Sequence, residues 1–213
     1  MSFFDKAKEK LAKVPVWAWA LGGVTTLFLL SEGTGTSDMI GGAFDWAKKE
    51  IFLNALPSPA SQYGDAIIQA SQEYGVDPTL TYAIGAQESG WGKYLSPNGP
   101  GGTGDEGHGH GLMQIDDHTW GDWLNNNDWT DPLTNIRKGL DIFTTQRQQI
   151  FDDYNGQIAQ DDLDRLAIVA YNHGVKGALN NAQNQVDYDT GTTGGNYSAS
   201  VLQHQASLQS LMA

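Results

Sequence analysis

The 213-residue chain contains no cysteine, and its 12 basic residues are outnumbered by 25 acidic ones. The absence of cysteine excludes disulfide bonds, thiolate metal sites and a cysteine nucleophile, although it leaves the cellular compartment open. A formal net charge of −13 leaves no basic patch to neutralise phosphates, so we expect no nucleic-acid partner. The length and apolar content suffice for one well-packed domain with an appendage.

Basic residues are concentrated at the N-terminus. Residues 1–13 carry four lysines against two acidic residues, whereas residues 32–213 carry eight basic and 23 acidic residues, a net charge of −15. Residues 14–30 between them are all uncharged. A lysine-flanked apolar run of about 17 to 25 residues is typical of a transmembrane helix.

We therefore predict a basic segment at 1–13 and a single transmembrane helix at 14–31, with Trp17 and Trp19 near an interface. The positive-inside rule places the N-terminus in the cytoplasm and residues 32–213 on the outer, periplasmic side. Two alternatives remain. A signal peptide normally has a shorter apolar core and a better cleavage site, and a buried core helix leaves the lysine flank unexplained.

The rest of the chain divides into a connector at 32–60 and a domain at 61–213. Residues 39–53 can form a short amphipathic helix, which could lie on the membrane or pack on the domain; the sequence leaves both open. In the domain, Asp77-Pro78 predicts a helix start and Gly90 a left-handed stop. The expected helices are 61–74, 77–89, 131–151, 161–172, 175–183 and 197–211, with one short strand at 111–116.

Glu88 occupies the last turn of its helix and borders the apolar stripe. Partial burial and the helix dipole both raise the pKa of a carboxyl group in this position, as a general acid near neutral pH requires. The plain alternative is a solvated glutamate at a frayed helix end.

The segment after Glu88 favours the functional interpretation. Residues 90–111 contain nine glycines in 22 positions, which predicts a long loop without stable helix or strand. Leu112, Gln114 and Asp116 then alternate, so they are expected to share one face of an extended segment. Asp116 and Asp105 could flank a cleft beside Glu88, and paired carboxylates are what glycosidic hydrolysis uses.

Four short motifs in order resemble the signatures of goose-type lysozymes and the related soluble lytic transglycosylases, over roughly residues 61–211. They are Glu88-Ser89, GDEGHGHGLMQID at 104–116, AYNHG at 170–174, and GTT at 191–193 followed by Tyr197. The resemblance implies a mainly α, lysozyme-like α+β domain with a very small β component. It also implies cleavage of the β-1,4 bond between N-acetylmuramic acid and N-acetylglucosamine, which makes peptidoglycan the expected partner.

By the resemblance, Glu88 matches the catalytic acid, and Asp105 and Asp116 match the acids that hold the attacking water. Lytic transglycosylases lack an acid matching Asp116, so both aspartates together favour inverting hydrolysis. The alternatives are a lytic transglycosylase, which forms a 1,6-anhydro product with the C6 hydroxyl of the sugar, and a non-catalytic peptidoglycan-binding anchor. The expected substrate-binding residues are Gln114, Tyr171, Asn172 and Tyr197, of which the tyrosines and Asn172 could instead be merely buried.

Three other features of the sequence give weaker indications of function. His108 and His110 could bind a divalent ion, but so many glycines give no rigid scaffold and the family needs none, so we expect neither a metal nor a cofactor. One or two of the tryptophans at 91, 120, 123 and 129 could stack on sugar rings.

An anchored muramidase would suit the membrane of a bacteriophage virion that must pierce a cell wall; a bacterial secretion or conjugation system is the second choice.

Overall fold

The computed structural model describes residues 48–213, so the predicted basic segment at 1–13 and the predicted transmembrane helix at 14–31 lie outside the described residues. Among the helices of the described range, none is long and apolar enough to cross a membrane. The transmembrane helix therefore stays a prediction.

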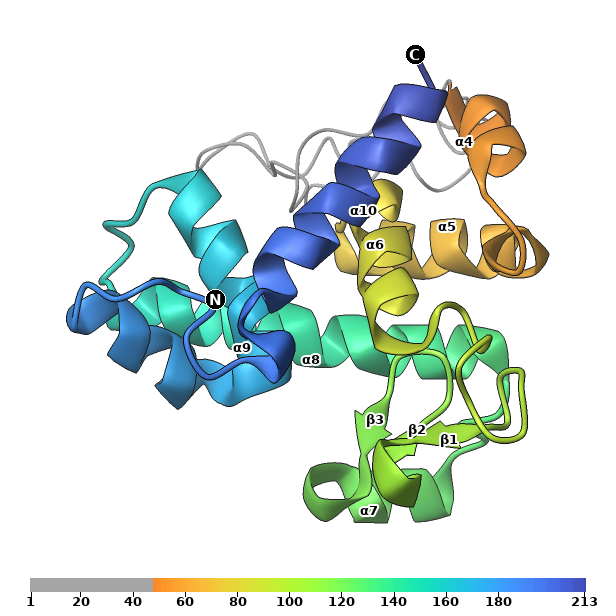
Figure 1. Ribbon diagram of the computed structural model, residues 1–213, viewed down its shortest axis with the longest axis horizontal. Coiled ribbons are helices and arrows are strands. Elements are labelled where there is room, and N and C mark those ends of the chain that lie inside the picture. The colour runs from red at the N-terminus through yellow and green to blue at the C-terminus, as the bar shows by residue number, and fades with distance from the viewer. Residues whose placement is uncertain (1–47) are drawn as a thin grey trace, which may run out of the picture. The chain divides into compact units, whose positions relative to one another are not determined.

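The described range is mainly helical with a very small β component, as predicted, and this component is one antiparallel sheet (Figure 1). The helices are α4 Lys49–Ala55, α5 Gly64–Tyr74, α6 Pro78–Ser89, α7 Asp117–Asn126, α8 Pro132–Asp153, α9 Gln160–Gln183 and α10 Tyr197–Leu211. The strands are β1 Thr103–Gly104, β2 Gly109–His110 and β3 Ile115–Asp116, in the order β1-β2-β3. Three short 3-10 turns are η2 Ala60–Tyr63, η3 Asp105–Gly107 and η4 Thr193–Gly195.

Helix α6 begins and ends where the sequence predicted. The Asp77 carboxylate accepts a hydrogen bond from the Thr79 backbone N–H at 2.7 Å, and Pro78 is the first helical residue. Gly90 ends the helix at a φ of 56°, which glycine adopts without steric cost. The helices expected at 161–172 and 175–183 are the two arms of α9, which bends at Gly174 with a φ of 73°.

Helix α6 lies at the centre of the domain. It packs against α5 and α10, while the long helix α8 packs against α5 and α9. Residues 78–85 of α6 are all buried, so the helix is covered on every side instead of presenting a single apolar stripe. Only the last turn of α6 emerges from the core, and Glu88 lies in that turn, on the side of the sheet.

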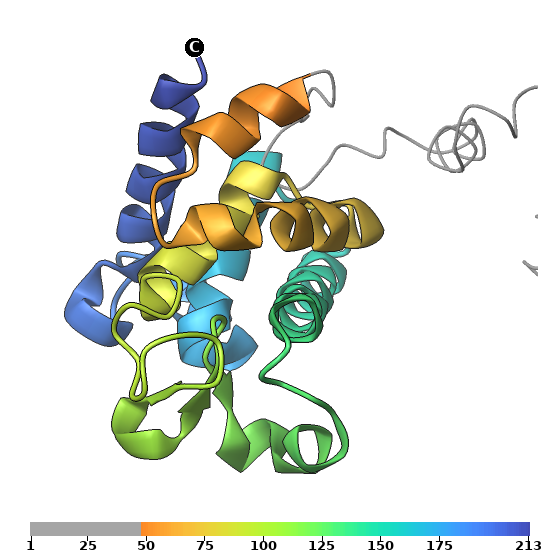
Figure 2. The ribbon, with the colours of Figure 1, turned by 90° about the vertical axis from the view of Figure 1, so that its right-hand side faces the viewer.

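The described part of the connector packs on the domain, as one of the two alternatives that the sequence left open would have it. Phe52 of α4 is fully buried, and Leu56 and Ala60 join it in the same core cluster as Ile67 and Ile84. Figure 2 shows α4 lying over the same body as α5 and α10. The core thus continues across residue 60 as far as Phe52 of α4.

The prediction of one extended segment at 111–116 was wrong. Only Ile115–Asp116 is a strand; residues 111–114 form a turn, and Gln114 has a left-handed φ of 49°. Leu112 and Met113 are both fully buried, so side chains do not alternate between two faces. Hydrogen bonds from three helices hold this turn, as described below.

The glycine-rich segment also has more structure than expected. It contains β1, η3 and β2, and Gly109 of β2 stands opposite Asp116 of β3. Helix α7, which was not predicted, follows at once and lies beside the sheet at one end of the domain (Figure 1). Its sequence, DHTWGDWLNN, has a glycine in the middle and few apolar residues, so the local pattern did not indicate a helix.

Candidate active site

A cleft of about 720 Å³ is lined by residues from α6, the sheet, α7, α8, α9 and η4 together with Tyr197. Every residue predicted for the site lies in its lining: Glu88, Asp105, Gln114, Asp116, Tyr171, Asn172 and Tyr197. The lining also includes Trp120, one of the four tryptophans considered as sugar contacts, and several residues that were not predicted, among them Gln87, Thr119, Ile142, Gln146 and Thr193. Segments more than 100 residues apart in the chain therefore meet in one cavity.

Glu88 is the most strongly perturbed acid of the cleft. It lies at the end of α6, half-buried, and the Tyr197 hydroxyl donates a hydrogen bond to its Oε1. Burial raises the pKa of Glu88 from 4.5 to about 7, although the hydrogen bond from Tyr197 acts to lower it. The carboxyl group can therefore keep a proton near neutral pH, which is the state that a general acid needs.

Tyr171 has a positioning role in addition to lining the cleft. Its hydroxyl donates to the Met113 backbone carbonyl at 2.8 Å. Burial, and next the charge of Glu88, raise the pKa of Tyr171 well above its ordinary value, so the hydroxyl stays protonated as a donor. Tyr171 thus links helix α9 to the turn that precedes β3.

Two residues that sequence reasoning missed hold the same turn. The Ser89 hydroxyl donates to the Leu112 carbonyl at 2.7 Å, and the Met113 N–H donates to Asn135 Oδ1 at 2.8 Å. Both side chains are fully buried. The turn is therefore fixed from α6, α8 and α9 together, and the only sequence signal was the serine that follows Glu88.

The two aspartates occupy different environments. Asp116 is the N-cap of α7: its Oδ2 accepts from the Thr119 N–H at 3.0 Å and from the Thr119 hydroxyl at 2.6 Å. His118 Nδ1 lies 3.2 Å from its Oδ1. Partial burial acts to raise the pKa of Asp116, but the hydrogen bonds from Thr119 and His118 outweigh it, so the pKa is lower than usual.

Asp105 begins η3 directly after β1 and is exposed, with a left-handed φ of 48°. Among the described residues no side-chain hydrogen bond holds its carboxylate. Asp105 therefore presents a free carboxylate to the cleft, whereas the oxygens of Asp116 already have partners.

The two predicted amides are partly used within the protein. Gln114 Nε2 donates to the Gly111 carbonyl at 2.8 Å. Asn172 exchanges two hydrogen bonds with Thr193, one from its Nδ2 to the hydroxyl at 3.1 Å and one from the Thr193 N–H to its Oδ1 at 2.9 Å. Both line the cleft, and Asn172 also ties α9 to η4; their contact with substrate stays a prediction.

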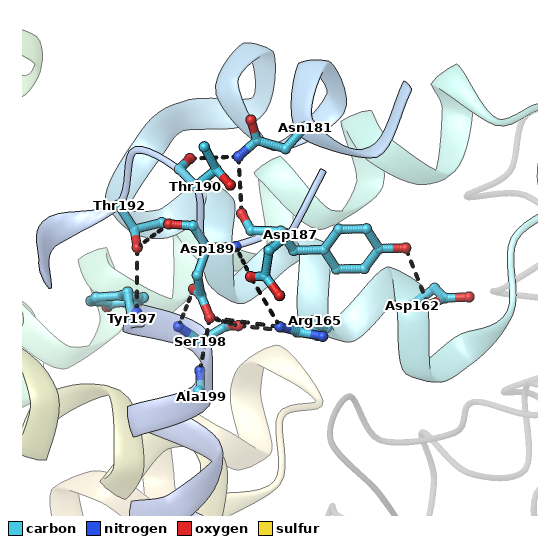
Figure 3. A network of polar contacts seen from close by, with 11 residues as sticks. Asp162, Arg165, Asn181, Asp187, Asp189, Thr190, Thr192, Tyr197, Ser198 and Ala199 are labelled. Atoms are coloured by element: carbon cyan, nitrogen blue, oxygen red, sulfur yellow. Dashed lines mark hydrogen bonds and ion pairs between the residues drawn. The ribbon is translucent and has the colours of Figure 1, made fainter. Parts of the chain in front are cut away.

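Tyr197 is held in place by a buried carboxylate that the sequence did not reveal (Figure 3). Asp189 is 2 % exposed and accepts hydrogen bonds from the Ser198 N–H at 2.6 Å, the Ser198 hydroxyl at 2.8 Å and the Ala199 N–H at 3.3 Å. Arg165 lies 3.7 Å from the same carboxylate. A negative charge here satisfies the free N–H groups of the first turn of α10, the turn that carries Tyr197.

The tryptophans separate into two roles. Trp91 is 2 % exposed, stacks with Tyr63 and with Tyr82, and donates from Nε1 to the Tyr82 carbonyl, so it belongs to the core. Trp120 lines the cleft, with Lys138 Nζ 3.5 Å from its ring centroid. Trp120 is therefore the one of the four tryptophans that lines the cleft, and its stacking on a sugar ring stays a prediction.

Comparison with known proteins places the chain in a family. No curated protein matches it. The family model described as Transglycosylase SLT domain matches residues 65–192, which is more than half of the chain and includes Glu88, Asp105, Asp116 and Tyr171. The matched range ends before Tyr197. The chain thus belongs to the Transglycosylase SLT domain family and is a lysozyme-like or lytic transglycosylase enzyme that cleaves glycosidic bonds, with peptidoglycan as its substrate.

Proposed function

We propose that this enzyme is a muramidase that cleaves the β-1,4 bond between N-acetylmuramic acid and N-acetylglucosamine by inverting hydrolysis. One observation carries the proposal: a single cleft contains a carboxyl group with a pKa of about 7 and two further carboxylates. A protonated acid together with an ionised carboxylate is the pair that inverting glycosidases use.

Glu88 is the general acid. Because the Tyr197 hydroxyl donates to Oε1, the proton of neutral Glu88 resides on Oε2, which is left to face the substrate. Transfer of this proton to the glycosidic oxygen accompanies the breaking of the bond to the anomeric carbon. The resulting Glu88 carboxylate is stabilised by the same tyrosine hydroxyl.

Asp105 is the better candidate for the base that activates water. Its carboxylate is exposed and free of side-chain hydrogen bonds among the described residues, so it can accept the proton of a water molecule as the hydroxide adds to the anomeric carbon. Asp116 accepts hydrogen bonds from Thr119 and His118 and is better suited to orient that water than to take its proton. This division refines the prediction that the two aspartates act together.

A lytic transglycosylase is the second candidate, and the family match favours it. In that reaction Glu88 protonates the leaving oxygen, and the C6 hydroxyl of the muramic acid residue then adds to the anomeric carbon and returns its proton to Glu88. No attacking water is needed, so Asp105 and Asp116 would serve only to bind or orient the sugar.

The products distinguish the two reactions. We would incubate the full-length chain with purified peptidoglycan and analyse the released muropeptides by mass spectrometry. Products with reducing ends would support hydrolysis, whereas products with 1,6-anhydro ends would show that the enzyme is a transglycosylase. The same assay with Glu88→Gln controls for contaminating enzymes, and binding to the wall without any fragments would contradict both reactions.

We further propose that residues 14–31 anchor the enzyme to a membrane with the cleft on the outer side. The support is the lysine-flanked apolar run, and a tether gives a high local concentration at the wall that an acidic enzyme would not reach through charge attraction. Alkaline extraction of membranes should leave the full-length chain in the pellet and release a variant lacking residues 14–31. Extraction of both would contradict the anchor.

The source that we favour for such an anchored muramidase is a bacteriophage virion with a membrane. Detection of the protein in purified virions would support this, whereas its presence only in uninfected cells would favour a bacterial secretion or conjugation system.

A further inference from the structure

Three histidines surround one aspartate beside the sheet. His108 Nδ1 lies 3.0 Å from Asp117 Oδ1, and His118 Nδ1 lies 3.3 Å from the same oxygen. His110 Nε2 lies 3.3 Å from the other oxygen, Oδ2. The sequence drew attention to His108 and His110 as a possible metal-binding pair, but we expected no metal there; folding brings Asp117 and His118 to them.

The spacing of these atoms suits a metal ion with tetrahedral coordination. A zinc ion bound at about 2.0–2.1 Å holds neighbouring ligand atoms about 3.3–3.4 Å apart. The two contacts to Asp117 Oδ1 are close to that value, and one ligand atom from each of His108, Asp117 and His118 lies within 4.8 Å of the others. Small adjustments of exposed side chains would therefore admit an ion.

The surroundings favour a cation. Residues 94–136 contain seven acidic residues and no lysine or arginine. His108 and His118 are exposed, whereas His110 is only 18 % exposed and its Nε2 lies 3.3 Å from Asp117 Oδ2. A histidine on the second oxygen of a ligating carboxylate orients it toward the metal.

From this geometry we propose that His108, Asp117 and His118 bind one divalent zinc-like ion, with His110 orienting the aspartate. Two imidazole nitrogens and one carboxylate oxygen favour zinc over calcium or magnesium, which prefer oxygen ligands alone. A water molecule would complete the tetrahedron. This site goes beyond the proposed hydrolysis. Because His118 Nδ1 also lies 3.2 Å from Asp116 Oδ1, a bound ion would replace that hydrogen bond.

The ion would join two segments that each carry a carboxylate of the cleft. His108 follows η3, which begins with Asp105, and His118 and Asp117 open α7, which Asp116 caps. Binding would therefore stabilise the attachment of the β1–β2 hairpin to α7. We expect zinc to raise the thermal unfolding midpoint of the protein, because a ligand that binds only the folded state stabilises it.

Calorimetric titration of the chelator-treated full-length protein with Zn²⁺ tests the proposal. We expect one ion per chain, weakened about tenfold or more in both His108→Ala and His118→Ala, with no change in His173→Ala, which removes an exposed histidine outside the cluster. Co²⁺ should give the intense visible absorption of a tetrahedral complex, and excess Ca²⁺ or Mg²⁺ should not displace it.

Three results would overturn the proposal: no zinc binding by the wild-type protein, equal affinity in wild type and both cluster variants, or equal competition by Ca²⁺. Because His108 and His118 are exposed, their substitution should leave the fold intact, and circular dichroism checks this. The cobalt spectrum of the wild-type protein is independent of any variant.

Discussion

The cleft has a helical side and a sheet side, and the two sides shift the pKa of a carboxyl group in opposite directions. On the helical side Glu88 is enclosed with Tyr171 and Tyr197, and burial raises its pKa to about 7. On the sheet side Asp105 is exposed. The pKa of Asp116 is lower than usual despite partial burial, because its carboxylate accepts hydrogen bonds. Different surroundings thus give similar carboxyl groups a protonated and an ionised role in one cavity.

The sides also differ in how they are built. Glu88 and Tyr197 come from α6 and α10, which pack on each other in the core. Asp105 begins the short turn η3 directly after β1, and Asp116 ends β3 and caps α7; each of these strands is two residues long. The acid therefore depends on tertiary packing, whereas the aspartates depend on local turn geometry and solvent. The predictions below test this contrast, from the largest expected effect to the smallest.

Glu88→Gln should lower kcat for peptidoglycan cleavage by about 10²–10⁴-fold, because glutamine keeps the shape but cannot supply a proton. Release of soluble muropeptides measures the rate, and circular dichroism controls for folding. Wild-type activity in this variant would contradict the assignment of the acid.

The same substitution should stabilise the protein above pH 7. The folded-state pKa of Glu88 lies above its ordinary value of 4.5, so the fold favours the protonated form and loses stability as pH rises from about 4.5 to about 7. The difference corresponds to roughly 3 kcal/mol at pH 8, and removing the charge should recover up to that amount. Urea unfolding at pH 8 should show the gain and at pH 4 none; an equal change at both would contradict the burial argument.

Asp105→Asn and Asp116→Asn separate the roles of the two aspartates. If Asp105 is the base, Asp105→Asn should reduce hydrolysis by about 10²-fold or more. Asp116→Asn should have a smaller effect on the rate, and it should cost about 1 kcal/mol or less of stability because asparagine also caps helices well. Glu106→Gln, a neighbouring exposed acid outside the cleft lining, is the control. Unchanged hydrolysis in both aspartate variants would remove the water-holding role.

Asp189→Asn should destabilise the protein by about 1–3 kcal/mol, because an amide nitrogen would face the buried donors of Ser198 and Ala199. Urea unfolding measures the loss. Asp187→Asn is the matched comparison: Asp187 lies 3.6 Å from the same arginine but is largely exposed, so its loss should cost less. Equal losses would show that the Asp189 network does not hold α10.

Tyr197→Phe should shift the pH profile more than the maximal rate. Activity requires protonated Glu88, so kcat/KM of the wild type should fall as pH rises through about 7. Without the tyrosine hydroxyl the pKa of Glu88 should rise further, and the decline should begin at higher pH. We expect a rate change of only about 2–10-fold at the optimum. Tyr94→Phe, at an exposed tyrosine, should leave the profile unchanged; a shift to lower pH in Tyr197→Phe would contradict the hydrogen-bond assignment.

Local chemistry was sufficient to find the helix that carries the acid. Asp77, Pro78 and Gly90 mark its two ends through hydrogen bonds and backbone angles that involve only near neighbours. The order of the short motifs was enough to identify the family and to select seven residues that all line one cleft. Helix α7 was missed, because its sequence has a central glycine and few apolar residues, and the helix gains support by packing beside β3.

Tertiary packing alone decided how those residues act. The contact between Tyr197 and Glu88 joins positions 109 residues apart, and the support of Tyr197 by Asp189 depends on a buried charge that no local pattern distinguishes from the other aspartates. The turn at 111–114 likewise follows from anchors on three helices, which override the strand that the alternating sequence predicted. Such contacts arise only when distant segments pack together, so a short window of sequence identifies the acid but cannot determine its pKa.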